Sequence, residues 1–112
     1  MKRLWKAFFY SLHGILAAWK DEPAFRQEIL LFVVLIPCAI YFAPDKISLI
    51  LMLGSLFLVL IVELLNTAIE ATVNRIGEEI HPLAKKAKDT ASAAVLFALV
   101  NLVVVWVVVL VF

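Results

Sequence analysis

The pattern of apolar and polar positions divides the chain into one amphipathic segment and three apolar runs. Residues 2–20 repeat apolar side chains every three or four positions, the spacing of a helix with one apolar face. Runs at about 24–42, 47–69 and 91–112 are apolar on nearly all sides. The last run has 22 residues and no charge, which is long enough for a helix to cross a bilayer. The pattern therefore predicts an all-α fold with one amphipathic helix and three transmembrane helices.

The amphipathic segment predicts a helix that lies in the membrane–water interface. Its apolar positions include Trp5 and Trp19, and basic residues occupy much of the remaining surface. Both features are typical of interfacial helices, and the alternative is a soluble-type helix packed on a protein core. The segment ends at Asp21-Glu22-Pro23, where a carboxylate before a proline predicts the N-cap of the next helix. Asp45 is the corresponding N-cap candidate for the helix that begins near residue 47.

Composition agrees with an integral membrane protein that forms one domain over residues 1–112. The chain is 65% hydrophobic and its mean hydropathy is +1.06, which is too apolar for a soluble domain of this size. Its N-terminal segment lacks the cleavable apolar core of a secretory signal. The single cysteine, Cys38, lies in an apolar run and has no partner for an intrachain disulfide. Because three short spans enclose only a thin core, we expect a homo-oligomer.

The placement of charge predicts how the spans are oriented. Eight of the ten Lys and Arg residues lie in the N-terminal segment or in the polar connection at 75–88, Arg26 lies just after the N-terminal segment, and the tenth is Lys46. The positive-inside rule then places the N-terminus and this connection in the cytoplasm and the C-terminus on the periplasmic side. Charged side chains consequently gather at the cytoplasmic interface, and they are Glu22, Arg26, Glu28, Glu63, Glu70, Lys88 and Asp89. No nucleic-acid partner is expected.

A stripe of polar residues marks the last third of the second span. Glu63, Asn66, Glu70 and Asn74 follow at spacings of three and four residues, which places them on one helical face. An ionisable group near the bilayer centre costs about 2.5–3.5 kcal/mol on insertion scales, so the stripe needs a reason. One interpretation is a polar seam that joins helices. The other is a site for a metal ion or a phosphate at the membrane surface.

The available side chains exclude several chemistries and favour one. There is no Walker motif, no Cys/His metal set and no local Ser-His-Asp hydrolase motif. His13 and His81 are isolated in the sequence and are interpreted as surface groups. Carboxylates suit Mg²⁺, Lys and Arg stabilise a transferring phosphoryl group, and a carboxylate can accept a proton from an alcohol. These groups would support phosphoryl transfer from a nucleotide to a lipid hydroxyl, although an ion pathway would use the same residue types.

Strings along nearly the whole chain resemble the bacterial integral-membrane diacylglycerol kinases, a small trimeric family unrelated to soluble kinases. The string Glu-x-x-Asn-x-x-x-Glu at 63–70, followed by Ala-Lys-Asp at 87–89, is quite specific to this family. The other matching strings are Ala17-Ala-Trp19, Glu22 with Ala24-Phe-Arg-Gln-Glu28, Arg75-Ile-Gly77 and Ser92-Ala-Ala-Val95. The resemblance implies transfer of the γ-phosphate of ATP to 1,2-diacylglycerol with Mg²⁺, at the bacterial inner membrane, in a homotrimer whose sites lie between subunits.

The resemblance also implies residue roles. Glu63 would be the general base or would position the lipid hydroxyl, with Asn66 supporting it by hydrogen bonding. Glu22 and Glu70 would hold the metal that bridges the ATP phosphates. The nucleotide would also contact Arg3, Tyr10, Glu79, His81, Lys88 and Asp89. The lipid site would be formed by Glu63 together with Arg3, Ser11, Trp19, Ala24, Phe25, Arg26, Gln27, Glu28 and Ser92.

The chain departs from the family pattern at three positions. Positions 13 and 16 are often basic in the best-known members and here are His13 and Leu16, and position 74 is usually Asp and here is Asn74. The change at 74 removes one negative charge near the nucleotide site. An undecaprenol kinase of the same family is the alternative activity, although the Ala-Phe-Arg-Gln-Glu and Arg-Ile-Gly strings favour the diacylglycerol branch. The alternatives from other functional classes are an ion- or proton-conducting protein and a structural membrane subunit.

Overall fold

A computed structural model describes residues 1–77 and 81–112, and over these ranges the chain is helical. The helices are α1 (Lys2–Asp21), α2 (Pro23–Phe42), α3 (Lys46–Ile76) and α4 (Pro82–Val111). α2, α3 and α4 are each long and apolar enough to cross a membrane. The prediction of an all-α fold with three helices able to span a membrane is therefore confirmed, whereas the amphipathic helix at an interface and the homo-oligomer stay predictions.

Local sequence sets the helix boundaries. Pro23 and Pro82 occupy the first turns of α2 and α4, where a missing N–H costs nothing. Pro23 also explains why α1 ends, because the residue before a proline is displaced from helical geometry, and Glu22 is extended at φ −116°, ψ 100°. Asp45 caps α3 as predicted, since its Oδ1 accepts a hydrogen bond from the Ser48 backbone N–H at 2.7 Å.

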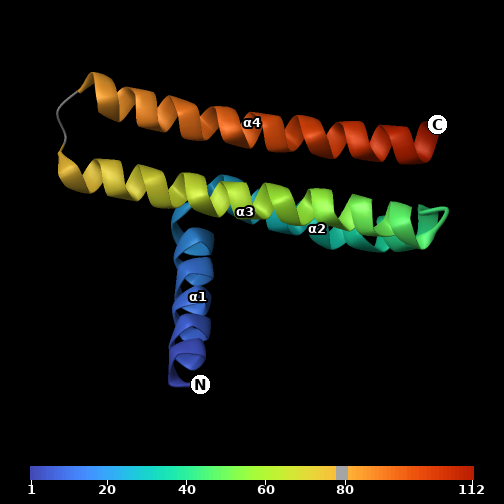
Figure 1. The fold of residues 1–112 in the computed structure, drawn as a ribbon, viewed down its shortest axis with the longest axis horizontal. Coiled ribbons are helices and arrows are strands. Elements are labelled where there is room, and N and C mark those ends of the chain that lie inside the picture. The colour runs from blue at the N-terminus through green and yellow to red at the C-terminus, as the bar shows by residue number, and fades with distance from the viewer. Residues whose placement is uncertain (78–80) are drawn as a thin grey trace.

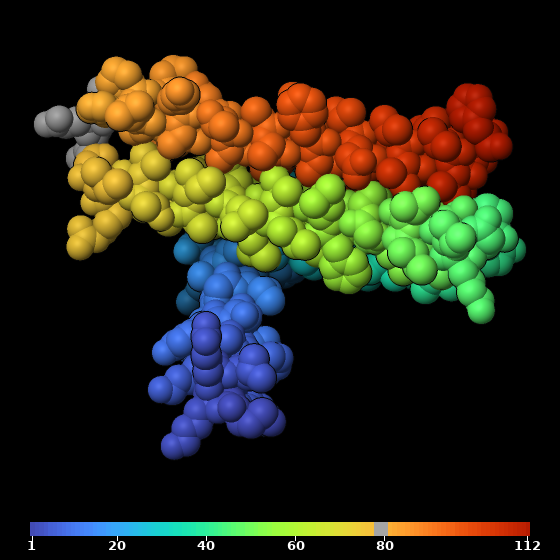
Figure 2. All heavy atoms as spheres, viewed as in Figure 1, coloured from blue at the N-terminus to red at the C-terminus, as the bar shows by residue number. Residues whose placement is uncertain are grey.

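α3 is the central helix of the bundle. α3 and α4 run antiparallel and lie side by side along their length, and α2 packs on another face of α3 (Figure 1). The core where the three meet consists of Phe32 from α2, Leu56 and Val59 from α3 and Ala98 from α4. The small Ala98 side chain allows α4 to approach α3 closely. α1 instead projects away from the bundle (Figure 2); it ends at Asp21, next to its C-cap Glu22, and Ala18 is its one buried residue.

Hydrogen bonds from Trp106, which we call the polar clamp, fix α4 against the first half of α3, near the turn between α2 and α3. The indole Nε1 of Trp106 donates to the Met52 carbonyl oxygen at 3.3 Å and to Ser55 Oγ at 3.2 Å. Ser55 Oγ in turn donates to the same Met52 carbonyl at 2.6 Å. Ser55 and Met52 are both buried. The clamp therefore satisfies polar groups that hydrocarbon could not solvate, and it fixes the register of the two helices.

The helices extend further than the apolar runs indicated. α3 continues to Ile76, beyond the run that ends at 69, and α4 begins at Pro82, well before 91. The polar connection predicted at 75–88 is accordingly shorter, because most of it is helical. In Figure 1 the paired ends of α3 and α4 extend past the level at which α1 meets the bundle. This arrangement places the polar ends of both helices beyond the apolar part of the bundle.

Candidate functional site

The polar stripe on α3 faces the junction where α1 meets α2. Glu63 is buried with 7% of its surface exposed, and Glu70 and Asn74 lie about two and three turns nearer the polar end of the helix. Asn66 Nδ2 donates to Glu70 Oε1 at 3.3 Å, as the spacing of four residues allows. The prediction that these four residues share one face is therefore confirmed.

An open cavity of about 640 Å³ lies between α1 and α3 beside this stripe. Small side chains on both helices create it, because Gly14, Ala17 and Ala18 face Ala68 and Ala71 and leave space between the backbones. Six polar side chains that could contact an ion or a phosphate line it, and they are Ser11, Asp21, Glu22, Thr67, Glu70 and Asn74. The cavity thus joins the two glutamates expected to hold a metal, and it adds Asp21, which the sequence had not singled out.

Glu22 is available for ligand binding because it does not act as a cap. It occupies the N-cap position of α2, as predicted, but its side chain makes no cap hydrogen bond. Its carboxylate instead lines the cavity, and so does the carboxylate of Glu70. Both carboxylates interact electrostatically with Glu63. Glu28 on α2 is likewise close enough for its charge to interact with Glu63. Three glutamates from different segments of the chain, Glu22, Glu28 and Glu70, therefore lie near the buried Glu63.

Two buried polar atoms in this region have no hydrogen-bond partner among the described residues. They are Glu28 Oε2 and Asn66 Oδ1. Buried polar atoms in folded proteins are nearly always paired, so a water molecule, an ion or a group from another molecule is expected to reach them. Asn66 was expected to support Glu63 by hydrogen bonding. In the structure its side chain donates to Glu70 instead.

The side chains in the cavity fit Mg²⁺ bound together with phosphates. Over residues 1–77 and 81–112, no group of three or more His, Cys, Asp or Glu side chains is arranged to hold a metal ion. Mg²⁺ usually takes one or two carboxylates and completes its shell with water and substrate phosphates. Glu22 and Glu70 on facing walls of one cavity meet that requirement.

The residues expected from α4 do not line this cavity. Lys88 is half-buried, and Asp89 forms an exposed ion pair with Lys85 at 2.6 Å, four residues earlier on the same helix. Ser92 is exposed near them. His81 caps α4, with its Nδ1 accepting a hydrogen bond from the Leu83 N–H at 3.1 Å. Glu79 lies outside the described residues. One chain therefore does not bring the α4 residues to the glutamate cavity.

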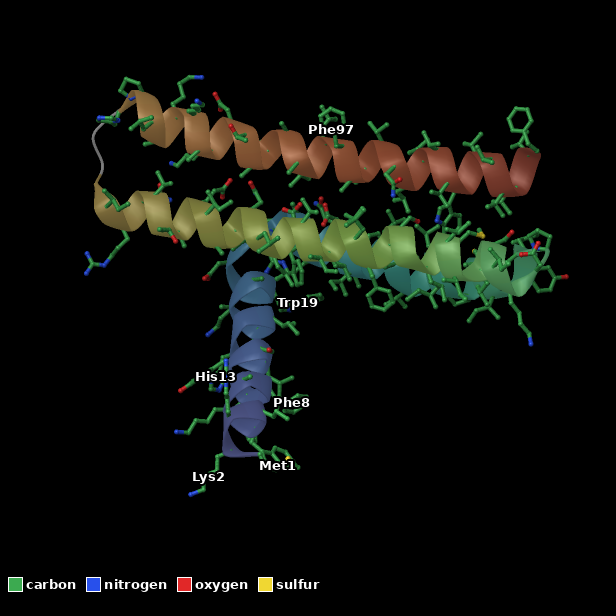
Figure 3. All side chains as sticks on the ribbon, in the orientation of Figure 1. Met1, Lys2, Phe8, His13, Trp19 and Phe97 are labelled. Atoms are coloured by element: carbon green, nitrogen blue, oxygen red, sulfur yellow. The ribbon has the colours of Figure 1, made fainter. Side chains whose placement is uncertain are left out.

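The residues expected from α1 occupy different parts of that helix. Ser11 lines the glutamate cavity, and its Oγ donates to the Ala7 carbonyl at 2.8 Å. Arg3 and Tyr10 instead lie beside a separate open cavity toward the free end of α1. Figure 3 shows Phe8 and Trp19 on one side of α1 and Lys2 and His13 on the other, as an amphipathic helix requires. Leu16, the other departure on α1, is exposed.

The residues expected from α2 divide into exposed and buried positions. Ala24 and Gln27 are exposed, and Arg26 and Glu28 are half-buried. Phe25 is only 2% exposed, so its ring packs inside the fold. The expected contact of Phe25 with a lipid substrate is therefore not available in the single chain, and its side chain stabilises the start of α2 against the bundle.

Fold and site together define a small helical membrane protein with an acidic cavity at the polar end of its bundle. Residues 9–110 match the family model described as prokaryotic diacylglycerol kinase, and the chain belongs to that family. It is 52% identical over 106 residues to a diacylglycerol kinase of Pseudomonas aeruginosa, covering 95% of this chain and 86% of that protein. A diacylglycerol kinase of Escherichia coli is 47% identical over 104 residues, covering 93% and 85%. A diacylglycerol kinase of Helicobacter pylori is 48% identical over 105 residues, covering 94% and 82%.

Proposed function

We propose that this chain transfers the γ-phosphate of ATP to the hydroxyl of 1,2-diacylglycerol and releases phosphatidate and ADP. The observation that carries the proposal is the cavity between α1 and α3, where Glu22 and Glu70 lie beside the buried Glu63. Membership of the prokaryotic diacylglycerol kinase family supports the same reaction. The three long apolar helices support a site at the inner membrane, where a lipid alcohol is available.

In the proposed reaction Glu63 accepts a proton. The lipid hydroxyl oxygen attacks the γ-phosphorus, the bond to the bridging oxygen of ADP breaks, and the hydroxyl proton passes to the Glu63 carboxylate. Such a positioned base contributes roughly 10²–10⁴-fold to rate. Burial of Glu63 among apolar helices supports this role, because it removes water that would compete with the lipid hydroxyl.

Glu22 and Glu70 hold Mg²⁺ in this proposal, and Lys88 and Asp89 contact the nucleotide. The metal supplies positive charge that offsets the negative charge developing on the phosphates. Arg3, Tyr10, Glu79 and His81 complete the nucleotide site. The lipid lies against the start of α2 and the end of α1, and it reaches Ser11, Trp19, Ala24, Arg26, Gln27, Glu28 and Ser92.

The proposed active unit is a homotrimer in which neighbouring chains complete each site. Two features of the single chain support sharing. The α4 residues Lys88, Asp89 and Ser92 do not line the cavity that contains Glu22 and Glu70, and buried atoms of Glu28 and Asn66 lack hydrogen-bond partners within the described part of the chain. A second chain would supply the missing groups.

Transfer of labelled γ-phosphate in mixed micelles tests the proposal. We expect purified protein to phosphorylate diacylglycerol, and Glu63→Gln, which is nearly isosteric, to lower turnover by about 10²-fold or more while the helix content is retained. Asp45→Asn is the matched control, since it makes the same carboxylate-to-amide change at the far end of α3. Absence of labelled phosphatidate with the folded wild-type protein would contradict the proposal.

The same assay with undecaprenol separates the two lipid kinase activities, because each lipid gives a distinct labelled product.

Ion conduction is less well supported, because it needs polar side chains along a path through the whole bundle, including the half away from the glutamate cavity. Ser55 there is buried and hydrogen-bonded to Met52 and Trp106, so it does not line a water-filled path.

A further inference from the structure

The carboxamide of Asn101 lies at the level of the apolar core without a hydrogen bond to any described residue. It is exposed on α4, between Ala98, which belongs to the core cluster, and Trp106, which packs against that cluster. It also lies inside the 22-residue run without charge that ends the chain. Asn101 is therefore a polar side chain placed where hydrocarbon surrounds the single chain.

Three other polar side chains of α3 and α4 show how such groups can be satisfied within one helix. Ser55 Oγ donates to the carbonyl of Met52, and Thr72 and Thr90 each donate to the carbonyl four residues earlier. Asn101 makes no such bond among the described residues. Ser55, the buried polar side chain to which α4 bonds through Trp106, is already engaged by Met52 and Trp106. Since lipid tails offer neither donors nor acceptors, the partner of Asn101 must come from outside this chain.

We propose that Asn101 hydrogen-bonds to a second copy of this chain. The strong bias of Lys and Arg to one side gives all copies the same orientation, so their Asn101 side chains lie at the same depth. A carboxamide is both donor and acceptor and is therefore complementary to itself. Asparagine side chains join transmembrane helices in this way. The inference rests on the homotrimer proposed above, and it adds which side chain makes a contact between the copies.

The surroundings of Asn101 permit such a contact. Ala94, Asn101 and Val108 are spaced by seven residues and share a flank of α4 beside the seam with α3. The small Ala94 side chain lets another helix approach. Only 6% of the most apolar window of α4 is buried within one chain, compared with 28% for α3. α4 therefore has free surface for a neighbour at this depth.

Association of fluorescently labelled copies, diluted with increasing detergent, tests the inference. We expect Asn101→Val to weaken association roughly three- to tenfold, because a hydrogen bond between membrane helices is replaced by ordinary lipid-like contact. Asn101→Gln should restore part of the loss. Val103→Ala is the control, since residue 103 is exposed on the opposite flank of α4. Equal association of Asn101→Val and the wild type would overturn the inference.

Cysteine cross-linking provides a second measurement that does not depend on the valine variant. In a Cys38→Ala background, Asn101→Cys should form disulfide-linked copies, and Val103→Cys should form fewer. Equal cross-linking at the two positions would also overturn the inference. Kinase activity measured on the same samples separates the two proposals. An inactive wild type whose association still depends on Asn101 would contradict the proposed function and leave the contact standing.

Discussion

At the scale of single residues, the site depends on how many carboxylates share one cavity. Asp21, Glu22 and Glu70 line it, and Asn74 occupies the position at which the family pattern has a fourth carboxylate. Like charges brought together in this way repel each other unless a cation lies between them. If Mg²⁺ binds in this cavity as proposed, the charge of the cavity should set the affinity for the metal.

Asn74→Asp should tighten metal binding. The new carboxylate would face the same cavity as Glu22 and Glu70, and its added attraction should lower the Mg²⁺ concentration for half-maximal activity by about three- to tenfold. Glu70→Gln removes a charge from the same cavity and should shift this concentration in the opposite direction. Binding of Mn²⁺, followed by electron paramagnetic resonance, checks the effect without relying on turnover. Unchanged or weaker Mn²⁺ binding in Asn74→Asp would contradict the prediction.

At the scale of helices, one tryptophan adds hydrogen bonds to the apolar contact between α3 and α4. Trp106→Phe keeps most of the ring in place but removes the donor to Met52 and Ser55. We expect a loss of about 0.5–1.5 kcal/mol in stability, because Ser55 keeps its own bond to Met52. Unfolding by titration with denaturing detergent measures it. Phe97→Leu is the control, since Phe97 is 73% exposed and points away from α3 (Figure 3); an equal loss there would show that the clamp is not the cause.

The start of α3 should make stability depend on acid pH. The Ser48 backbone N–H donating to Asp45 lowers the pKa of that carboxyl below its ordinary value of 3.8. A lowered pKa means that the cap stabilises the fold above pH 3.8 and that this contribution is lost as pH falls through the lower folded value. Asp45→Asn keeps an N-cap acceptor but cannot titrate. Thermal unfolding between pH 6 and pH 3 should therefore fall less steeply for Asp45→Asn than for the wild type, and parallel curves would contradict this.

For single residues and for helices, the sequence predicted those features that depend on residues close together in the chain. Residues that act within one helix were predictable, such as the Asp45 cap and the shared face of Glu63 and Glu70. Hydrophobicity marked only the lipid-immersed part of each helix, so the extension of α4 to Pro82 was missed. The Trp106 clamp and the entry of Asp21 into the cavity depend on how helices rotate against each other. That rotation is set by packing across the chain and is not encoded in the spacing of one segment.

At the scale of the whole molecule, the distribution of charge determines which side of the membrane carries the cavity. α1 meets the bundle at Glu22, and the Lys- and Arg-rich ends of α3 and α4 extend past that level (Figure 1). Lys46 lies at the other end of α3. If the basic residues are cytoplasmic, as the positive-inside rule predicts, then the cavity opens where ATP is available.

Single-cysteine labelling tests this orientation directly. In a Cys38→Ala background, a membrane-impermeant maleimide added to intact cells with a permeable outer membrane should label Lys46→Cys. It should label Lys2→Cys only after the inner membrane is opened, because α1 would be cytoplasmic. Both positions are exposed in the fold, so burial within the chain does not protect either one. The reverse labelling pattern would place the glutamate cavity on the side without ATP, and the proposed reaction could not occur there.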